Sequence, residues 1–144
     1  MKYLVIVNPT SGRGYAEKMI PVIESEMRKH ALDFDLVRTE RPWHAAEIAE
    51  AAVKDGKYQV IVTASGDGTA NETLNGIMRV RGAGYDNVAL ALLPVGTGND
   101  MSYGLGVRGT LEENIAALAR DVHQMIDIGL VKGGDYPDGR YFAN

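Results

Sequence analysis

The stretch Gln59-Val60-Ile61-Val62-Thr63-Ala64-Ser65-Gly66-Asp67-Gly68-Thr69 decides the fold of this chain. Its first part, Gln59–Ala64, is apolar and β-branched in the middle, which predicts a strand buried on both faces. A glycine-rich turn follows directly, and an apolar helical face then runs from Ala70 to Met78. A strand, a tight turn and a helix in this order form one unit of a parallel α/β sheet.

The same alternation of strands and helices extends to both sides of this unit. Further strands are expected at Tyr3–Val7, Phe34–Thr39 and Val88–Leu93. Apolar residues at helical spacing predict helices around Met19–Met27 and Ala45–Val53. Repeated β–α units of this kind predict an α/β fold, a Rossmann-like open parallel sheet with helices on both faces.

Several residues predict where the helices begin and end. Pro21 must lie in the first turn of its helix or kink that helix. Gly56 is placed to end the second helix. Thr110, with Glu113 three residues later, forms a capping box that opens a further helix.

The last part of the chain has a different pattern. Met125–Val131 and Arg140–Phe142 are strand-like, and Gly133–Gly139 between them is rich in turn residues. The final strand runs to Asn144 without a polar tail, so we expect a fragment that stops where a further sheet begins. The predicted domains are an α/β domain over residues 1–125 and the start of a truncated β-rich domain over residues 126–144.

Composition excludes several classes of protein. The chain has 144 residues, of which 45% are hydrophobic and 24% charged, close to globular averages. Absence of cysteine excludes a disulfide scaffold, a Cys-ligated zinc site and a Cys nucleophile. A net charge of −4 disfavours a nucleic-acid partner. No apolar window approaches the ~18 residues of a membrane span, and no signal peptide opens the sequence, so a cytoplasmic protein is expected.

Three turns that follow predicted strands carry unusual residues. They are Asn8–Gly14, Ser65–Glu72 and Pro94–Asp100, each rich in glycine and hydroxyl groups. The carboxyl ends of parallel strands share one edge of a sheet, where ligands bind. Glycine lets the backbone approach a ligand, and helix N-termini present free N–H groups to anions. Tight turns favour the same residues without any ligand, but three at one edge predict a polyphosphate cradle.

Asp67 is the most informative residue of these turns. A carboxylate between two glycines would repel phosphate unless Mg²⁺ intervenes or the carboxylate bonds a substrate hydroxyl. The alternative is a turn or N-cap residue. Asp100 has the same two interpretations, and the cap is favoured there because a helix-like stretch follows. Arg13 is the single basic residue of these loops, so backbone N–H groups and a metal would have to meet the charge of a nucleotide.

Other familiar patterns are absent or out of context. The sequence has no Walker motif and no nucleophile elbow. Gly104–Gly109 matches G-x-G-x-x-G but does not follow a buried strand. His30, His44 and His123 lack metal-ligand spacing, and the first two fit a helix end and a helix start.

Taken in series, the three turns resemble the diacylglycerol kinase catalytic domain family. The similarity rests on Asn8-Pro9-x-Ser11-Gly12, on Gly66-Asp67-Gly68-Thr69 with Asn71-Glu72 and Asn75-Gly76 behind it, and on Gly96-Thr97-Gly98-Asn99-Asp100. It covers nearly the whole chain in the right order. The resemblance implies a nucleotide-binding fold shared with NAD kinases, and an ATP site in the first 125 residues.

The resemblance also implies roles for particular residues. Asp67 would be the carboxylate most directly tied to catalysis, and would contact Mg²⁺ through Mg-ATP. The residues that would line the ATP site are Asn8, Pro9, Thr10, Ser11, Gly12, Thr39, Ser65, Gly66, Asp67, Gly68, Thr69, Ala70, Asn71 and Thr97. By sequence alone, Thr39 is a hydroxyl at the end of a strand.

Two departures from the family pattern qualify this expectation. The family usually has glycine where this chain has Ser65, which is harmless if the backbone there is still strand-like. Family members also continue into a β-rich domain that supplies the general base and structural metal ligands, expected here beyond Asn144. The isolated fragment is therefore expected to be inactive.

The activity that the resemblance implies is ATP-dependent phosphoryl transfer to the hydroxyl of diacylglycerol or a similar lipid alcohol. ATP and Mg²⁺ are the expected cofactors, and the protein would contact a membrane surface transiently, as a cytoplasmic peripheral protein. Two alternatives stay open: an NAD kinase-like enzyme with a soluble substrate, and a non-catalytic nucleotide-binding regulatory module. The sequence does not determine the lipid or the oligomeric state.

Overall fold

The computed structural model describes residues 1–143, and Asn144, the last residue of the expected β-rich segment, lies outside them. The chain alternates strands and helices before it ends in a hairpin. The elements are β1 (Lys2–Val7), α1 (Tyr15–Lys29), β2 (Asp33–Arg38), α2 (His44–Asp55), β3 (Val60–Ser65), α3 (Asp67–Met78), β4 (Ala89–Pro94), α4 (Asp100–Gly104), α5 (Leu111–Leu118), β5 (Gly129–Gly133) and β6 (Tyr136–Phe142).

The first four strands form one parallel sheet in the order β2-β1-β3-β4. In register, Val5 of β1 lies between Leu36 of β2 and Val62 of β3. The two central strands, β1 and β3, are almost entirely buried. Strands covered on both faces read as continuous apolar runs, which is the pattern of the sequence here. The predicted parallel α/β fold is therefore confirmed.

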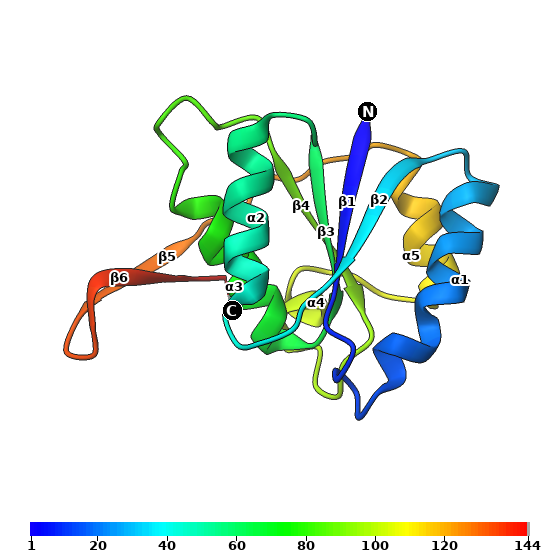
Figure 1. The fold of residues 1–144 in the computed structure, drawn as a ribbon, viewed down its shortest axis with the longest axis horizontal. Helices are drawn as coiled ribbons and strands as arrows, with labels where there is room; N and C mark the ends of the chain where they lie inside the picture. The colour runs from blue at the N-terminus through cyan, green and yellow to red at the C-terminus, as the bar shows by residue number, and fades with distance from the viewer. Residues whose placement is uncertain (144) are drawn as a thin grey trace.

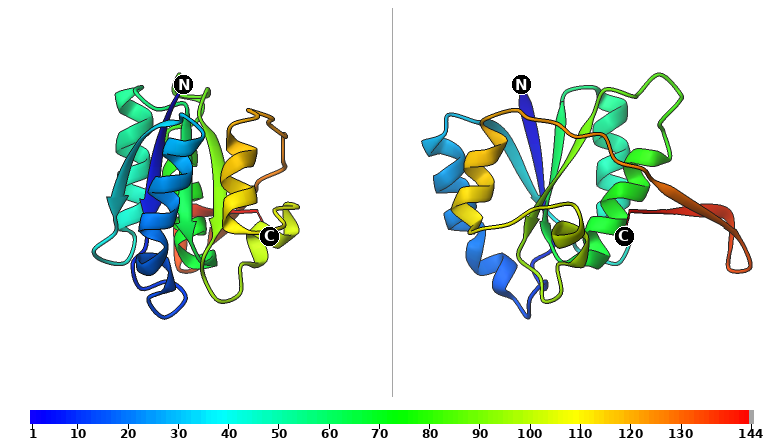
Figure 2. Two further views of the ribbon diagram at one scale, coloured as in Figure 1. Left: turned by 90° about the vertical axis from the view of Figure 1, so that its right-hand side faces the viewer. Right: turned by 180° about the vertical axis from the view of Figure 1, so that it is seen from behind.

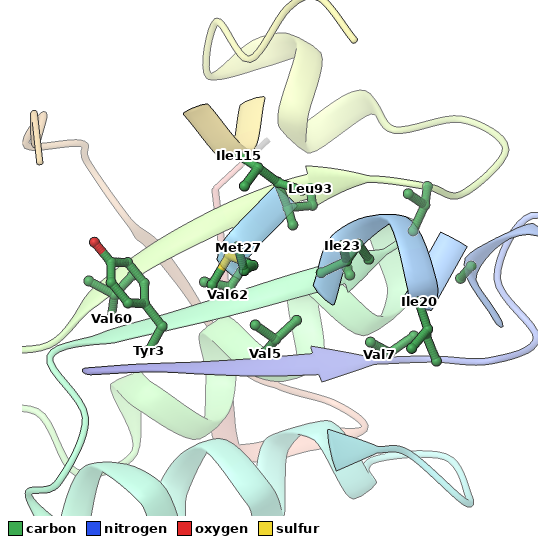
Figure 3. Close-up of a cluster of buried hydrophobic side chains, with 13 residues drawn as sticks. Tyr3, Val5, Val7, Ile20, Ile23, Met27, Val60, Val62, Leu93 and Ile115 are labelled. Atoms are coloured by element: carbon green, nitrogen blue, oxygen red, sulfur yellow. The ribbon is translucent and has the colours of Figure 1, made fainter. Parts of the chain in front are cut away.

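Helices cover both faces of the sheet (Figure 1). Helices α1 and α5 pack on one face through a cluster that includes Ile23 and Ile115, both fully buried. Figure 3 shows these side chains in one cluster with Val62 and Leu93 of the sheet. Helices α2 and α3 cover the other face, where Ile6 and Ile61 meet the alanine-rich side of α2.

Most of the residues that were expected to begin and end helices behave as predicted. Gly56 adopts a left-handed conformation (φ 71°) directly after α2. Thr110 and Glu113 make both hydrogen bonds of the capping box. Pro21 lies inside α1 as its seventh residue, which excludes a position in the first turn, the first of the two predicted alternatives. The helix begins at Tyr15, before its predicted apolar spacing, directly after Gly14, which adopts a left-handed conformation (φ 89°) at the N-cap.

The C-terminal part differs from the prediction in its boundaries. Strand β5 begins at Gly129, so the expected strand over Met125–Val131 is wrong in its first four residues. Val122 and Met125 are more than four-fifths exposed on a segment that crosses from α5 to the hairpin without a strand partner among residues 1–143. Strand β6 begins at Tyr136, four residues before the predicted start, because the hairpin turns over only two residues.

The antiparallel β5–β6 hairpin projects away from the α/β body (Figures 1 and 2). Its side chains are mostly exposed, in contrast to β1 and β3. Within residues 1–143, no helix is both long enough and apolar enough to cross a membrane.

Candidate active site

The three glycine-rich turns meet at the carboxyl edge of the sheet, as predicted. The side-chain amide of Asn8 donates to Thr69 Oγ1 (2.8 Å), which joins the first turn to the second. Ser11 Oγ accepts the backbone N–H of Gly66 (3.3 Å) and joins them again. The helix that follows the third turn, α4, is attached through Asp67, whose Oδ1 accepts the backbone N–H of Met101 (2.8 Å). These contacts link residues up to 61 positions apart into one site.

The first turn needs its glycines. Gly12, Arg13 and Gly14 all have positive φ angles, of 60°, 56° and 89°. A Cβ on Gly12 would lie 2.7 Å from the carbonyl oxygen of Val95 in the third turn. The sequence Ser11-Gly12 therefore permits a left-handed turn and close packing between the first and third turns.

A second close approach joins the second and third turns. A Cβ on Gly96 would lie 2.2 Å from the Cα of Gly66, so only glycine fits at position 96. Asn99 closes the third turn, because its side-chain amide donates to the carbonyl of Gly96 and its Oδ1 accepts the N–H of the same residue. The backbone of both turns is thereby fixed beside the start of α3.

Asp67 is the first residue of α3 and follows Gly66, which is extended. With Oδ1 fixed by Met101, the other oxygen, Oδ2, lies 3.0 Å from the position that a Cβ on Gly98 would take. One carboxylate oxygen is thus committed to the start of α4, and the second faces the third turn. Gly66 is the N-cap of α3, so Asp67 serves another helix and not the cap that was weighed above; its catalytic role stays a prediction.

This hydrogen bond also gives Asp67 a part in the packing of α3 on α4. Removal of the side chain would leave the N–H of buried Met101 without this acceptor, at a cost of about 1–3 kcal/mol. Asp100, by contrast, is not the cap of α4, because Asn99 precedes the helix and makes no side-chain cap. The side-chain acceptor for an N–H group at the start of α4, that of Met101, comes instead from Asp67 on α3.

The start of α3 gathers several predicted site residues. Gly68 is exposed, Asn71 half-buried, and Thr69 and Ala70 are buried on the inner side of the helix. The first backbone N–H groups of a helix have no partner within the helix, so they point at whatever occupies the edge. Thr10, in the first turn, bonds Asn8 Oδ1 through its N–H and its hydroxyl, which orients the Asn8 amide toward Thr69.

The remaining predicted residues are distributed around this centre. Pro9 is half-buried in the first turn, and Thr97 is exposed on the third. Thr39 is buried directly after β2, where its N–H bonds the carbonyl of Val7. Thr39 therefore lies at the carboxyl edge of the sheet, where this backbone hydrogen bond fixes its position.

Ser65 ends β3 in a strand conformation and is buried. Its hydroxyl lies 2.6 Å from that of Thr63 and bonds the carbonyl of Gly66. The strand-like interpretation of this departure from the family pattern is confirmed, and the hydroxyl is engaged within the protein.

Sequence reasoning missed the parts of the site that act through the backbone. Gly96, Asn99 and Met101 shape the third turn or hold Asp67, although only Thr97 was assigned from that turn. The signal for Gly96 and Asn99 was present in the quoted motif. Nothing in the sequence indicated that the N–H of Met101 would be the partner of Asp67.

Residues 1–143 contain no group of three or more His, Asp or Glu side chains placed to hold a metal ion. Asp67 and Asp100 both face Gly98, where a Cβ would lie 3.0 Å and 3.7 Å from their Oδ2 atoms. Mg²⁺ keeps several waters and commonly binds one or two carboxylates together with substrate phosphates. The hard oxygen of Asp67 fits that mode, in which the ion arrives with the nucleotide.

Comparison with known proteins decides the family. The model of the diacylglycerol kinase catalytic domain matches residues 2–131, which include all three turns. The chain belongs to this family. The resemblance drawn from the turns is thereby confirmed.

Relatives within the diacylglycerol kinase catalytic domain family include enzymes of two names. The chain is 33% identical to a diacylglycerol kinase of Bacillus subtilis, over 97% of this chain and 43% of the relative. It is 32% identical to human sphingosine kinase 2, over 94% of this chain and 20% of that protein. A crystal structure of a diacylglycerol kinase from Bacillus anthracis superposes with a TM-score of 0.71 at 26% identity, over 90% of this chain and 45% of that one. The chain thus spans less than half the length of these relatives.

Proposed function

We propose that this chain forms the nucleotide-binding part of an ATP-dependent lipid kinase that phosphorylates the hydroxyl of diacylglycerol or a similar lipid alcohol. The observation that carries the proposal is the convergence of three glycine-rich turns around Asp67 at the start of α3. Family membership supports kinase chemistry, and the names of the relatives support a lipid substrate.

The proposed phosphate site is the N-terminal turn of α3 with the first turn beside it. Exposed Gly68 lets an anion approach the helix N–H groups, which favour negative charge. Arg13 is the single cation of the three turns and is exposed at the first turn. Backbone N–H groups would therefore bind most of the phosphate charge.

Asp67 is the proposed catalytic carboxylate. Its Oδ1 is held by Met101, so the orientation of the group is set before any ligand binds. Its Oδ2 would then bind the Mg²⁺ that accompanies ATP, and the ion would neutralise phosphate charge when bound. Phosphoryl transfer depends mainly on positioning and electrostatics, which a carboxylate fixed in this way supplies.

The proposed acceptor lies in a bilayer, so the proposal includes transient contact with a membrane surface by a cytoplasmic, peripheral protein. Diacylglycerol is the first acceptor to test, because bacterial relatives carry that name. Sphingosine and NAD are the comparison acceptors. Phosphorylation of NAD alone would favour a soluble-substrate kinase instead.

Asp67→Asn is the sharpest test, because asparagine keeps an oxygen for the N–H of Met101 and removes the charge. We expect transfer from labelled ATP to diacylglycerol, measured in the protein at its full natural length, to fall by roughly 10²–10³-fold. The fold should persist, as judged by circular dichroism.

Asp86→Asn is the matched control, because Asp86 also accepts one backbone N–H, from Gly82 (2.7 Å), outside the three turns. It should leave transfer unchanged. Wild-type turnover by a folded Asp67→Asn variant would contradict the assignment of Asp67. Nucleotide binding without transfer to any of the three acceptors would favour a regulatory module.

A further inference from the structure

Asn75 joins the exposed hairpin to helix α3. Its side chain is 4% exposed and faces β6. The amide nitrogen donates to the carbonyl of Tyr141 (2.9 Å), while Oδ1 accepts the N–H of the same residue (2.8 Å). These two bonds are what a neighbouring strand would give Tyr141, so the side chain of a helix takes the place of a strand.

Arg140, the residue before Tyr141, makes a second contact between the hairpin and the body. The guanidinium of Arg140 lies 4.3 Å from the ring centre of Trp43 and 4.1 Å from that of Tyr136. Trp43 directly precedes α2, and Tyr136 begins β6. Arg140 is therefore held between the α/β body and the hairpin, in the geometry of cation–π attraction.

The position of Asn75 links this contact to the candidate active site. Asn75 lies eight residues after Asp67 on the same helix, which is about 12 Å along the axis. Gly76 beside it fixes α3 against α2, because a Cβ there would lie 2.2 Å from the carbonyl oxygen of Ala46. The helix is thus a rigid connection between the hairpin and the Asp67 carboxylate.

The hairpin in turn places apolar groups beside the site helix. Asn71, one turn before Asn75, borders a small hollow of about 180 Å³ together with Val131 and Phe142 of the hairpin. The amide of Asn75 also donates to the carbonyl of Asn71 (2.9 Å). The same side chain therefore touches the turn that was assigned to the nucleotide and the strand that forms an apolar wall next to it.

We propose that Asn75, with the stack of Trp43, Arg140 and Tyr136, forms a clasp that fixes the hairpin to α3, and that Asn75 is a positioning residue for phosphoryl transfer. It acts by holding the apolar wall in register with the phosphate site, and it binds no nucleotide. This role rests on the proposed kinase function, whereas the clasp itself does not.

The first test is Asn75→Leu, which keeps the size of the side chain and removes both bonds to Tyr141. Loss of two neutral hydrogen bonds should shift the ratio of docked to open hairpin by roughly 5- to 150-fold. Hydrogen exchange of the Tyr141 amide should accelerate by the same factor in the 144-residue chain, while the amides of β3 keep their protection.

Trp43 gives a second readout, because it is the only tryptophan of the chain. Arg140 covers its ring, so Asn75→Leu and Arg140→Ala should both increase quenching of its fluorescence by acrylamide. Asn114→Leu is the matched control, since Asn114 is also a buried helical asparagine, 8% exposed, and lies on α5. It should change neither quenching nor exchange at Tyr141.

Kinetics at full natural length test the positioning role. Asn75→Leu should lower kcat for the lipid alcohol by the fraction of open hairpin and leave the KM for ATP unchanged. Unchanged exchange at Tyr141 would overturn the clasp, and so would equal loss of protection in β3. An altered clasp with wild-type kcat would overturn the positioning role alone. Failure of the wild-type protein to bind ATP would refute the proposed function and leave the exchange result standing.

Discussion

The α/β body and the β5–β6 hairpin are stabilised in different ways. In the body, strands β1 and β3 bury nearly every side chain between two layers of helices. In the hairpin, most side chains are exposed, and the contacts with the body include the hydrogen bonds of Asn75, the Arg140 stack and the apolar packing of Ile128 and Ala143 at the two ends of the hairpin. Hydrophobic burial in the body is spread over many residues, whereas the hairpin is attached through a small number of contacts, several of them polar and with specific geometry. Point substitutions should therefore have very different effects in the two regions.

The largest difference in stability is expected between a leucine-to-alanine substitution in the body and the same substitution in the hairpin. Leu93 of β4 is 1% exposed in the core, and Leu130 of β5 is 44% exposed. Leu93→Ala should lower the free energy of unfolding by about 2–5 kcal/mol, because it removes buried methyl groups and leaves a cavity. Leu130→Ala should change it by no more than about 0.5 kcal/mol. Urea denaturation of the chain measures both, and equal losses would contradict the distinction between body and hairpin.

A smaller effect on stability is expected where α3 packs on α2. The hairpin contacts α3 through Asn75. Gly76→Ala would place a Cβ 2.2 Å from the carbonyl oxygen of Ala46 and should cost about 1–3 kcal/mol of unfolding free energy. Gly68→Ala is the control within the same helix, since a Cβ there has no neighbour within 4 Å. It should be neutral or stabilise the fold by up to about 1 kcal/mol, because alanine favours helix. Thermal unfolding distinguishes the two, and a neutral Gly76→Ala would show that the helices separate easily.

The smallest effect on stability is expected for Asp35, a carboxylate on β2, an edge strand of the sheet. Hydrogen bonds from Lys57 and Tyr58 lower the pKa of Asp35 to about 2 from its ordinary value of 3.8. A lowered pKa in the folded state gives stability that is present above pH 3.8 and is lost as the pH falls through about 2. Asp35→Asn should therefore reduce stability slightly at neutral pH, and the difference from wild type should shrink as the pH approaches 2.

The control for this pH effect is Asp138→Asn on the hairpin. Asp138 is exposed and makes no ion pair with another residue between 1 and 143. Its variant should follow the wild-type acid-unfolding curve. If Asp35→Asn also followed that curve down to pH 2, the contacts of Asp35 with Lys57 and Tyr58 would contribute nothing to stability.

The sequence revealed where the candidate site lies, but not which atoms meet in it. The three turns could be placed at one edge because β1, β3 and β4 are parallel and each turn follows its strand. Which atoms meet there could not be predicted. Asp67 was open to two interpretations, and the structure assigns one oxygen to Met101, 34 positions away. Hydrogen bonds between distant loops depend on the packing of the whole sheet, which local patterns do not encode.

The C-terminal region was harder to predict for the same reason. The apolar run from Met125 to Val131 was expected as one strand, but only its last residues pair with β6. A strand exists only where a neighbour completes its hydrogen bonds, and the sequence of one strand does not name its neighbour. Asn75 was quoted as part of a motif without a role, because its partner Tyr141 lies 66 positions further along the chain.

The sequence by itself determined the α/β class, the order of strands and helices, the capping of α5 and the edge at which the glycine-rich turns gather. These features follow from periodicity and from backbone preferences, which act within a few residues of each position. Only the tertiary structure decided the close contact of Gly66 with Gly96, the commitment of Asp67 to Met101 and the docking of the hairpin on Asn75. Each of these joins residues from different elements, and their geometry is fixed only when the sheet and its two helix layers pack together.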